Sequence, residues 1–210
     1  MVLVITPEKH RENAALLEEM YALRATVIQR WGWNIPNFDP QRDKDQFDTD
    51  ETIYFLDLDE ETGEMIGTVR FNPTTSDHLM NTIFAEMCEE GIPSGERIWE
   101  ASRYMLDSHR WPNWKYLRGR VRLAYALNEY ALENGIHSMS WLTTLPLYRN
   151  MIKLWPTEPL GMPKYFADDD NTYIAALSTF TEEAGDMLLQ RIGGSLGMTI
   201  APDRPVVYHA

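Results

Sequence analysis

The chain has 210 residues, of which 44% are hydrophobic and 11% aromatic, with a formal net charge of −13 at pH 7 and one cysteine, Cys88. This size suits one domain, residues 1–210, with a substantial core, and the acidic balance excludes general nucleic-acid binding, which depends on Lys and Arg neutralising phosphates. One cysteine excludes a disulfide framework, no apolar run reaches the roughly 18 residues of a membrane span, and the N-terminal residues lack the basic start of a secretion signal. We therefore expect a cytoplasmic protein without a membrane span.

The first predicted element is an amphipathic helix over residues 7–30. Thr6 before Pro7 is a plausible N-cap, and Gly32 ends the pattern. One face carries apolar residues at helical spacing, namely Leu16, Met20, Leu23 and Val27. Arg24 lies on this same stripe, where the simplest interpretation is a side chain that snorkels to solvent.

A long polar and aromatic loop follows over residues 31–51. Loops of this length without regular structure are uncommon unless they serve a function such as a lid. The loop places Asp45 and Asp48 around Phe47, downstream of Trp31 and Trp33. Taken alone, this is either a solvated acidic loop or a site where carboxylates and aromatic faces attract a cation or stack on a base.

The rest of the chain alternates strands and helices. Strands at 52–58 and 65–71 flank a turn and form a predicted hairpin, and a short helix is expected around 79–87. The remaining predicted elements are a strand at 98–106, a helix at 114–136, a strand at 137–144, a helix at 145–155, a strand at 172–179 and a helix at 182–193. This order predicts an α/β (α+β) fold, a three-layer αβα sandwich with a mixed central sheet covered on both faces.

The predicted strand at 98–106 contains two charges, Glu100 and Arg103. Residues three apart in a strand point to opposite faces unless a β-bulge intervenes, and a buried charge needs a partner. The pair is either two unrelated ion pairs or a general base beside an anion-binding guanidinium. Arg70 closes the neighbouring strand and is either an edge arginine or a ligand contact.

A basic run opens the helix at 114–136. It is either a solvated helix face or a docking patch for an anionic partner, formed by Lys115, Arg118, Arg120 and Arg122. Gly119 alone does not make a phosphate-binding loop, and Ser102 lacks the G-x-S-x-G context of a hydrolase. The five histidines show no metal-ligand spacing, so we predict no metal site.

Taken in order, these residues resemble the LuxI-type acyl-homoserine-lactone synthases, the autoinducer synthases of quorum sensing. The resemblance is close over about the first half of the chain and looser beyond it. Two positions depart from the family pattern, because Ile28 and Tyr104 stand where the family has Phe. The motifs that carry the resemblance are Arg24, Gly32-Trp33, Asp45-x-Phe47-Asp48, Gly67-x-x-Arg70 with Pro73-Thr74, Phe84, and Trp99-Glu100-x-Ser102-Arg103.

The resemblance implies a fold related to the GCN5-type N-acetyltransferases, no prosthetic group, and two substrates. These are S-adenosylmethionine and an acyl thioester carried by acyl carrier protein or coenzyme A. Glu100 would be the base, and a bulge at Ser102–Tyr104 would supply oxyanion donors beside Arg103. The residues implied for S-adenosylmethionine are Arg24, Trp33, Asp45, Asp48, Arg70, Phe84 and Arg103.

The acyl chain is expected to bind among residues 137–155. Alternate residues of a strand share a face, so the predicted lining is Met139, Trp141, Thr143, Leu145, Met151 and Leu154. The Thr143 hydroxyl would suit a 3-oxo group, whereas the bulk of Trp141 would limit chain length. An acidic carrier protein would dock on the basic run, with steering that weakens in salt.

Two other functions compete with this interpretation. One is a GCN5-type N-acetyltransferase that uses acyl-coenzyme A on another amine, and the other is a binding module without chemistry. The Asp45-x-Phe47-Asp48 loop argues against the first. Two charges retained within a strand argue against the second, because unpaired buried charges destabilise a fold.

Overall fold

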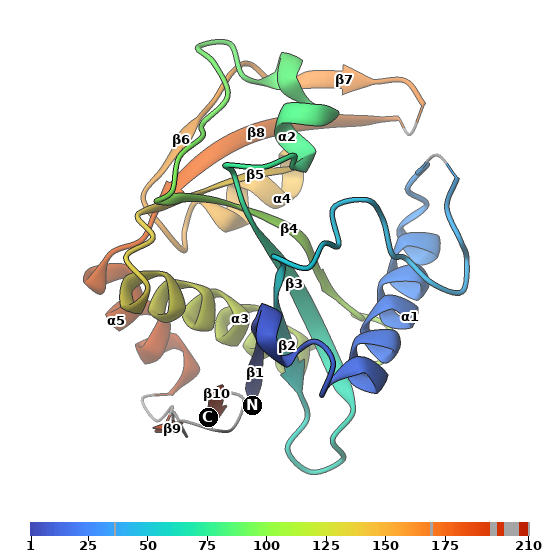
Figure 1. The fold of residues 1–210 in the computed structure, drawn as a ribbon, viewed down its shortest axis with the longest axis vertical. Helices are drawn as coiled ribbons and strands as arrows, with labels where there is room; N and C mark the ends of the chain where they lie inside the picture. The colour runs from blue at the N-terminus through green and yellow to red at the C-terminus, as the bar shows by residue number, and fades with distance from the viewer. Residues whose placement is uncertain (36, 169, 194–196, 200–205, 210) are drawn as a thin grey trace.

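The computed structural model describes residues 1–35, 37–168, 170–193, 197–199 and 206–209. Within these residues one mixed sheet runs through the molecule (Figure 1), in the order β6-β8-β5-β4-β3-β2-β1-β10-β9, with β7 paired to β8. Only β4 and β5 are parallel among the described pairs. The strands are β1 (Val2–Ile5), β2 (Ile53–Leu58), β3 (Met65–Pro73), β4 (Ile98–Leu106), β5 (Ser138–Thr144), β6 (Thr157–Pro159), β7 (Lys164–Phe166), β8 (Asn171–Thr179), β9 (Gly197–Thr199) and β10 (Val206–His209).

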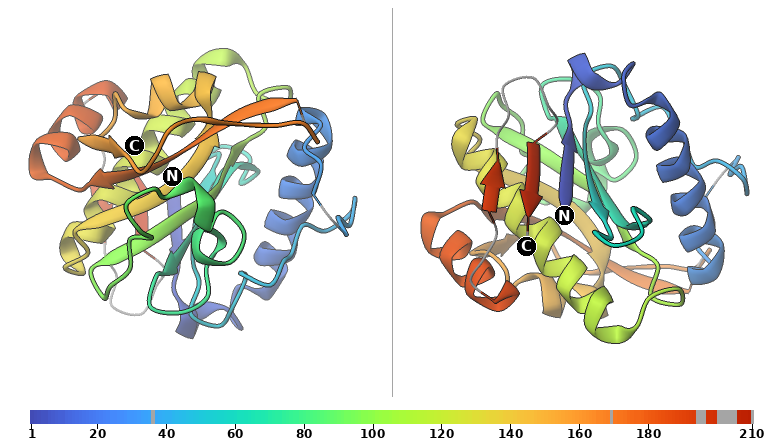
Figure 2. Two further views of the ribbon diagram at one scale, coloured as in Figure 1. Left: turned by 90° about the horizontal axis from the view of Figure 1, so that it is seen from above. Right: turned by 90° about the horizontal axis from the view of Figure 1, so that it is seen from below.

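Helices cover both faces of this sheet. Figure 2 shows α1 on one side and α3 with α5 on the other. The predicted three-layer arrangement with a mixed sheet is therefore confirmed. The helices are α1 (Ala14–Trp31), α2 (Leu79–Thr82), α3 (Asn113–Glu133), α4 (Leu145–Met151) and α5 (Glu182–Ile192), with 3-10 turns η1 (Pro7–Lys9) and η2 (Ala85–Met87).

The sheet separates two hydrophobic cores. The larger core joins the sheet to α3 and α5 and contains Phe55, Phe71 and Leu123. The second core lies under α1 and contains Met20, Ile28 and other residues of the predicted apolar stripe. Burying such residues contributes about 1.5–3 kcal/mol each, so the two cores hold the layers together. No helix among the described residues has the length and apolar character needed to cross a membrane.

The first helix begins later than predicted. Pro7–Lys9 form a single 3-10 turn, and α1 starts at Ala14 after Asn13. The residues between the two helices are polar or partly exposed and offer no apolar side chain to the core, so packing does not favour a helix there. His10 instead fixes this segment, because its Nε2 atom lies 2.8 Å from the carbonyl oxygen of Thr52.

Two irregularities in β4 determine the site. β4 pairs with β5 only from Ile98–Glu100, so the strands separate beyond this point and form a fork. On the other side, the register between β3 and β4 shifts so that Val69 opposes both Arg103 and Tyr104. Arg103 has a φ of 53°, the left-handed conformation that glycine usually adopts at such a bulge.

Candidate active site

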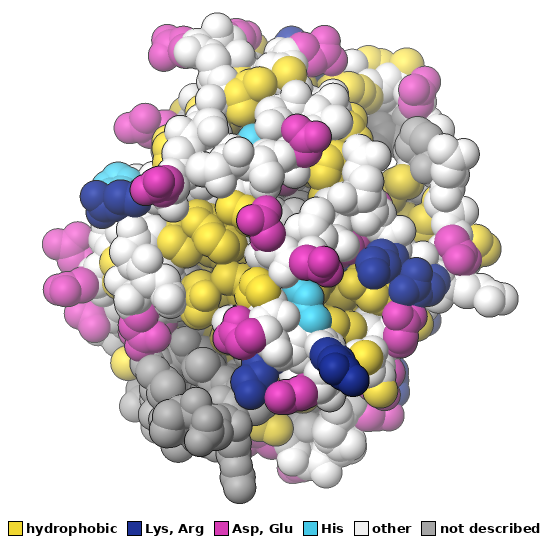
Figure 3. Space-filling view, in the orientation of Figure 1, with side chains coloured by type: hydrophobic (Ala, Val, Ile, Leu, Met, Phe, Trp, Pro, Cys, Tyr) yellow, Lys and Arg dark blue, Asp and Glu magenta, His cyan; other side chains and the backbone are white. Residues whose placement is uncertain are grey.

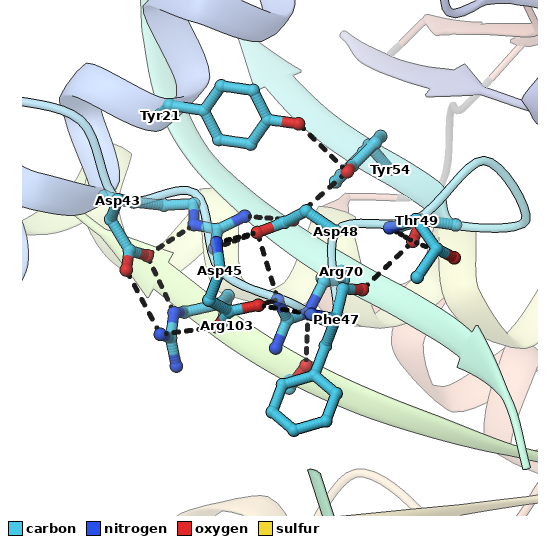
Figure 4. A network of polar contacts seen from close by, with 12 residues as sticks. Tyr21, Asp43, Asp45, Phe47, Asp48, Thr49, Tyr54, Arg70 and Arg103 are labelled. Carbon is cyan, nitrogen blue, oxygen red and sulfur yellow. Dashed lines mark hydrogen bonds and ion pairs between the residues drawn. The ribbon is translucent and has the colours of Figure 1, made fainter. Parts of the chain in front are cut away.

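Six charged side chains from four segments form one network beside β3 and β4 (Figure 4). The three guanidiniums balance the three carboxylates, and none of the six is mostly exposed. The long loop between α1 and β2 supplies all the carboxylates, so the network fixes that loop to the sheet. The members are Arg24, Arg70, Arg103, Asp43, Asp45 and Asp48.

Arg24 anchors the network from α1. Its side chain is fully buried and does not snorkel as the simplest interpretation held. Nε donates to Asp43 Oδ2 at 2.7 Å, while Nη1 and Nη2 donate to the two oxygens of Asp48 at 2.8 and 3.0 Å. Burial alone would raise the pKa of Asp48, but the Arg70 and Arg24 guanidiniums outweigh it and hold this pKa below its usual range.

Asp43 is the member that the sequence motifs did not single out. Its Oδ2 atom accepts from Nε of both Arg24 and Arg103 at 2.7 Å, and its Oδ1 accepts from Arg103 Nη2 at 3.1 Å. The pKa of Asp43 is lowered, because these two cations overcome the effect of burial. The signal that could have identified Asp43 was its position two residues before Asp45, in the same acidic run.

Arg103 and Arg70 extend the network across the sheet. Arg103 Nη2 donates to Asp45 Oδ2 at 2.9 Å, and Arg70 Nε donates to Ser102 Oγ at 2.9 Å. Arg70 Nη1 contacts Asp45 and lies 3.1 Å from Asp48 Oδ2. Its Nη2 atom is buried and has no hydrogen-bond partner among the described residues. The Nη2 amino group of Arg70 is therefore left to donate to another group.

Glu100 lies on the same face of the sheet as Arg103 because of the bulge. Glu100 pairs across the strands with Asn72, whose side chain donates to the carbonyl of Phe47 in the loop at 2.8 Å. The two Glu100 carboxylate oxygens accept from the backbone N–H groups of Leu79 and Met80 at 2.9 and 2.7 Å. Both charges predicted within the strand thus have buried partners.

Burial raises the pKa of Glu100. The N–H donors from Met80 and Leu79 and the nearby His78 and Arg70 side chains oppose this shift without cancelling it. A carboxylate with a raised pKa accepts protons more readily at neutral pH. The geometry is therefore compatible with a base, although the carboxylate also holds the start of α2.

A cavity of about 90 Å³ lies in the fork between β4 and β5. Trp31, the last residue of α1, and Trp33 in the loop that follows border it on one side, and Met139 and Trp141 border it from β5. Trp141 is fixed there, because its indole N–H donates to Ser178 Oγ at 2.8 Å. The complete lining is Trp31, Trp33, Ala101, Ser102, Arg103, Tyr104, Leu106, Tyr116, Arg120, Met139, Trp141, Leu142, Thr143, Leu147 and Met151.

Four of the six predicted acyl-pocket residues line this cavity, but Leu145 and Leu154 do not. Three of these four, Met139, Trp141 and Met151, also belong to the larger core. Leu154 follows the end of α4 and packs into the larger core. Leu142 and Leu147, which were not predicted, take their place in the lining.

Phe84 and two residues of the basic run, Lys115 and Arg122, lie away from this cavity. Phe84 packs in an apolar cluster near α2, with its ring centroid 6.1 Å from that of Phe166, and does not line the cavity. Arg122 is buried against Asp57 Oδ2 at 2.9 Å, and Lys115 pairs with Asp59.

Arg120 lines the cavity and Arg118 is half-buried, so the four residues do not form one exposed docking patch. Figure 3 shows acidic side chains spread over the face drawn, with Lys and Arg in separate places between them.

The chain belongs to the autoinducer synthase family, which it matches over residues 8–184. It is 29% identical over 182 residues to an isovaleryl-homoserine lactone synthase of Bradyrhizobium diazoefficiens, covering 85% of this chain and 79% of that one. It is 37% identical over 83 residues to an acyl-homoserine-lactone synthase of Ralstonia solanacearum, covering 39% of this chain and 40% of that enzyme.

Solved structures agree with this family. The coenzyme A-dependent acyl-homoserine lactone synthase BjaI, with S-adenosylmethionine and isopentyl-coenzyme A, superposes with a TM-score of 0.82 at 25% identity and covers 92% of this chain and 89% of its own. The synthase LasI superposes with a TM-score of 0.77 at 23% identity, covers 90% of this chain and 94% of its own, and supports the fold alone. The predicted family is therefore confirmed, and the chain has the fold of these solved synthases.

Proposed function

We propose that this protein is an acyl-homoserine-lactone synthase. It transfers an acyl group from a thioester to the amine of S-adenosylmethionine. The methionyl carboxylate then closes the lactone and expels methylthioadenosine. The observation that carries this proposal is the cavity in the β4–β5 fork. This cavity has the aromatic loop and Arg103 on one side and the apolar residues of β5 on the other.

The loop that follows α1, which contributes Trp33 to this cavity, suits S-adenosylmethionine. Asp45 has 24% of its side chain exposed, whereas Asp43 and Asp48 are at 4% and 0%, so Asp45 is the carboxylate that can meet a ligand cation or hydroxyl. Trp33 offers an aromatic face to the adenosyl group or the sulfonium. Arg24 and Asp48 are fully enclosed, so their role is to hold the loop.

The first bond forms between the substrate amine and the thioester carbonyl. The α-amine of S-adenosylmethionine is mostly protonated at neutral pH, so Glu100 removes a proton from it, directly or through a water. The bulge at Arg103 takes backbone N–H groups out of the regular ladder, and these are suited to stabilise the oxyanion. Ser102 contributes by holding Arg70 through its hydroxyl.

The second bond forms within the product of the first step. The sulfonium is already a good leaving group, so the site has only to fold the methionyl carboxylate toward its own γ-carbon. Two guanidiniums are placed for this task. Arg103 borders the cavity, and the buried Nη2 amino group of Arg70 has no protein partner among the described residues.

We propose a coenzyme A thioester as the acyl donor in preference to acyl carrier protein. The likeness to a coenzyme A-dependent synthase over 92% of this chain supports this choice, and so does the likeness to an isovaleryl-homoserine lactone synthase. The burial of Arg122 and the pairing of Lys115 also remove two cations from the surface that a carrier protein would need.

The test is expression in a bacterium that makes no lactone, with organic extracts analysed by mass spectrometry. The wild-type protein is expected to yield a homoserine-lactone fragment ion, and Asp45→Asn is expected to reduce it strongly. Purified protein is then given isovaleryl-coenzyme A or the same acyl group on carrier protein. A rate with the carrier protein that exceeds the rate with coenzyme A would overturn the choice of donor.

A further inference from the structure

A row of buried polar side chains crosses three strands beneath α2. Asn72, Glu100 and Ser140 are neighbours in the registers of β3, β4 and β5. All three are at most 2% exposed. The segment that opens α2 covers this row, since its backbone N–H groups bind Glu100. His78, the residue before α2, is fully buried and close enough to influence Glu100 electrostatically.

Three atoms around Glu100 have no hydrogen-bond partner among the described residues. They are Asn72 Oδ1, Ser140 Oγ and His78 Nε2. The orientation of the imidazole is fixed, because His78 Nδ1 lies 2.9 Å from the carbonyl oxygen of Ser76. A carbonyl only accepts, so Nδ1 carries the proton and Nε2 presents a lone pair in the neutral ring. Buried polar atoms are rarely left alone, and this set suits ordered water next to a proton acceptor.

The proposed reaction needs such an acceptor. Two protons leave the substrate ammonium as it becomes an amide, and the departing thiolate takes back only one. One proton per acyl transfer must therefore leave the site. Glu100 can hold a single proton, and its buried carboxylate is bound to two backbone N–H groups and has little access to solvent.

We propose that His78 acts through Glu100 as the second proton acceptor of the site, and this inference rests on the proposed function. The proton that Glu100 removes from the amine passes to His78 Nε2 through water held by Ser140 and Asn72. Glu100 is thereby ionised again before the tetrahedral intermediate loses its second proton. His78 does not touch the substrate and is a positioning residue for the base.

Two other ionisable groups of the described residues also interact with Glu100, namely Arg70 on β3 and the buried thiol of Cys88, after η2. Glu51 lies on the solvent side, where it accepts from Ser76 Oγ at 3.3 Å. The loss of one titrating group from the activity profile can therefore be assigned to His78 by substitution.

The experiment is the pH dependence of kcat/KM for the acyl donor in wild type, His78→Asn and His78→Gln. Asn keeps a donor near the Nδ1 position and Gln keeps a polar group near Nε2, but neither titrates. Each variant is expected to lose at least tenfold in kcat with KM for S-adenosylmethionine within twofold. The limiting acid slope of log(kcat/KM) is expected to fall by one.

Asn81→Ala is the matched control, because Asn81 belongs to the same cap but carries no titrating group: its Oδ1 accepts from the backbone N–H of His78 at 2.9 Å and its Nδ2 donates to the Ser76 carbonyl at 3.4 Å. It is expected to keep the wild-type acid slope. An unchanged kcat and slope in both His78 variants would overturn the inference, as would an equal loss in Asn81→Ala.

A measurement on the wild-type protein alone tests the inference even if the His78 variants do not fold. The single-turnover rate of acylation is measured in mixtures of H2O and D2O. A plot of this rate against the fraction of D2O is expected to curve, since two protons move. A linear plot would overturn the proton transfer from Glu100 to His78 while leaving the synthase activity in place. A wild-type protein that makes no lactone would instead overturn the proposed function and this inference with it.

Discussion

Replacing Asp43 with asparagine should destabilise the fold through both of its arginine partners. Asp43 accepts three charge-assisted hydrogen bonds, and neither it nor Arg24 or Arg103 is more than 9% exposed. The asparagine amide keeps one acceptor oxygen but no charge, so the network is left with an unbalanced buried cation. Removing one partner of a buried pair costs roughly 3–5 kcal/mol. Arg24 and Arg103 retain Asp48 and Asp45, so we expect about 3 kcal/mol.

The assay is urea unfolding with Glu18→Gln as the control. Glu18 pairs with Arg42 at 2.6 and 2.8 Å, a geometry similar to that of Asp43, but its side chain is 55% exposed. Exposed pairs contribute below about 1 kcal/mol, so the control should change little. The reasoning would be refuted if Asp43→Asn lost no more stability than Glu18→Gln at an unchanged m-value.

The remaining predictions concern chemistry, pH and the cavity. Glu100→Gln should lower kcat by at least about 100-fold, with normal folding by circular dichroism, and full activity would exclude Glu100 as the base. Burial raises the pKa of Asp57 to about 6, above its usual value of about 3.9, so folding favours the protonated form. Ionisation of Asp57 should therefore cost about 3 kcal/mol of stability as pH rises from about 4 to 6, and thermal melts of Asp57→Asn should lack this decline. Trp141→Ala should enlarge the cavity and shift kcat/KM toward longer acyl chains, by about fourfold for each added buried methylene, and an unchanged chain-length profile would contradict the assigned pocket.

The sequence predicted the secondary-structure elements better than it predicted which side chains contact one another. The apolar stripe of α1 was readable from its spacing, yet the spacing could not show that Arg24 meets Asp43 and Asp48 inside the protein. Such partners come from a loop whose path depends on tertiary contacts. β1 went unpredicted because four apolar residues fit a strand or a buried helix equally well.

Side-chain direction explains the other differences. The predicted pocket included Leu154, but α4 ends at Met151 and the chain then turns into the core. Arg122 falls on the inner side of α3, where it meets Asp57 from β2, a contact between distant parts of the chain. In contrast, the bulge at Arg103 could be anticipated, because only a shift in register lets Glu100 and Arg103 share a face.

The most direct test of the central claim is the stoichiometry of products from the purified protein. S-adenosylmethionine and isovaleryl-coenzyme A are mixed with the enzyme, and three products are quantified: acyl-homoserine lactone, methylthioadenosine and free thiol. The proposed reaction predicts equal amounts of all three. Free thiol without methylthioadenosine would show that the thioester is cleaved, by water or by an amine, without lactonisation, and this result would contradict the assignment of both steps to one site.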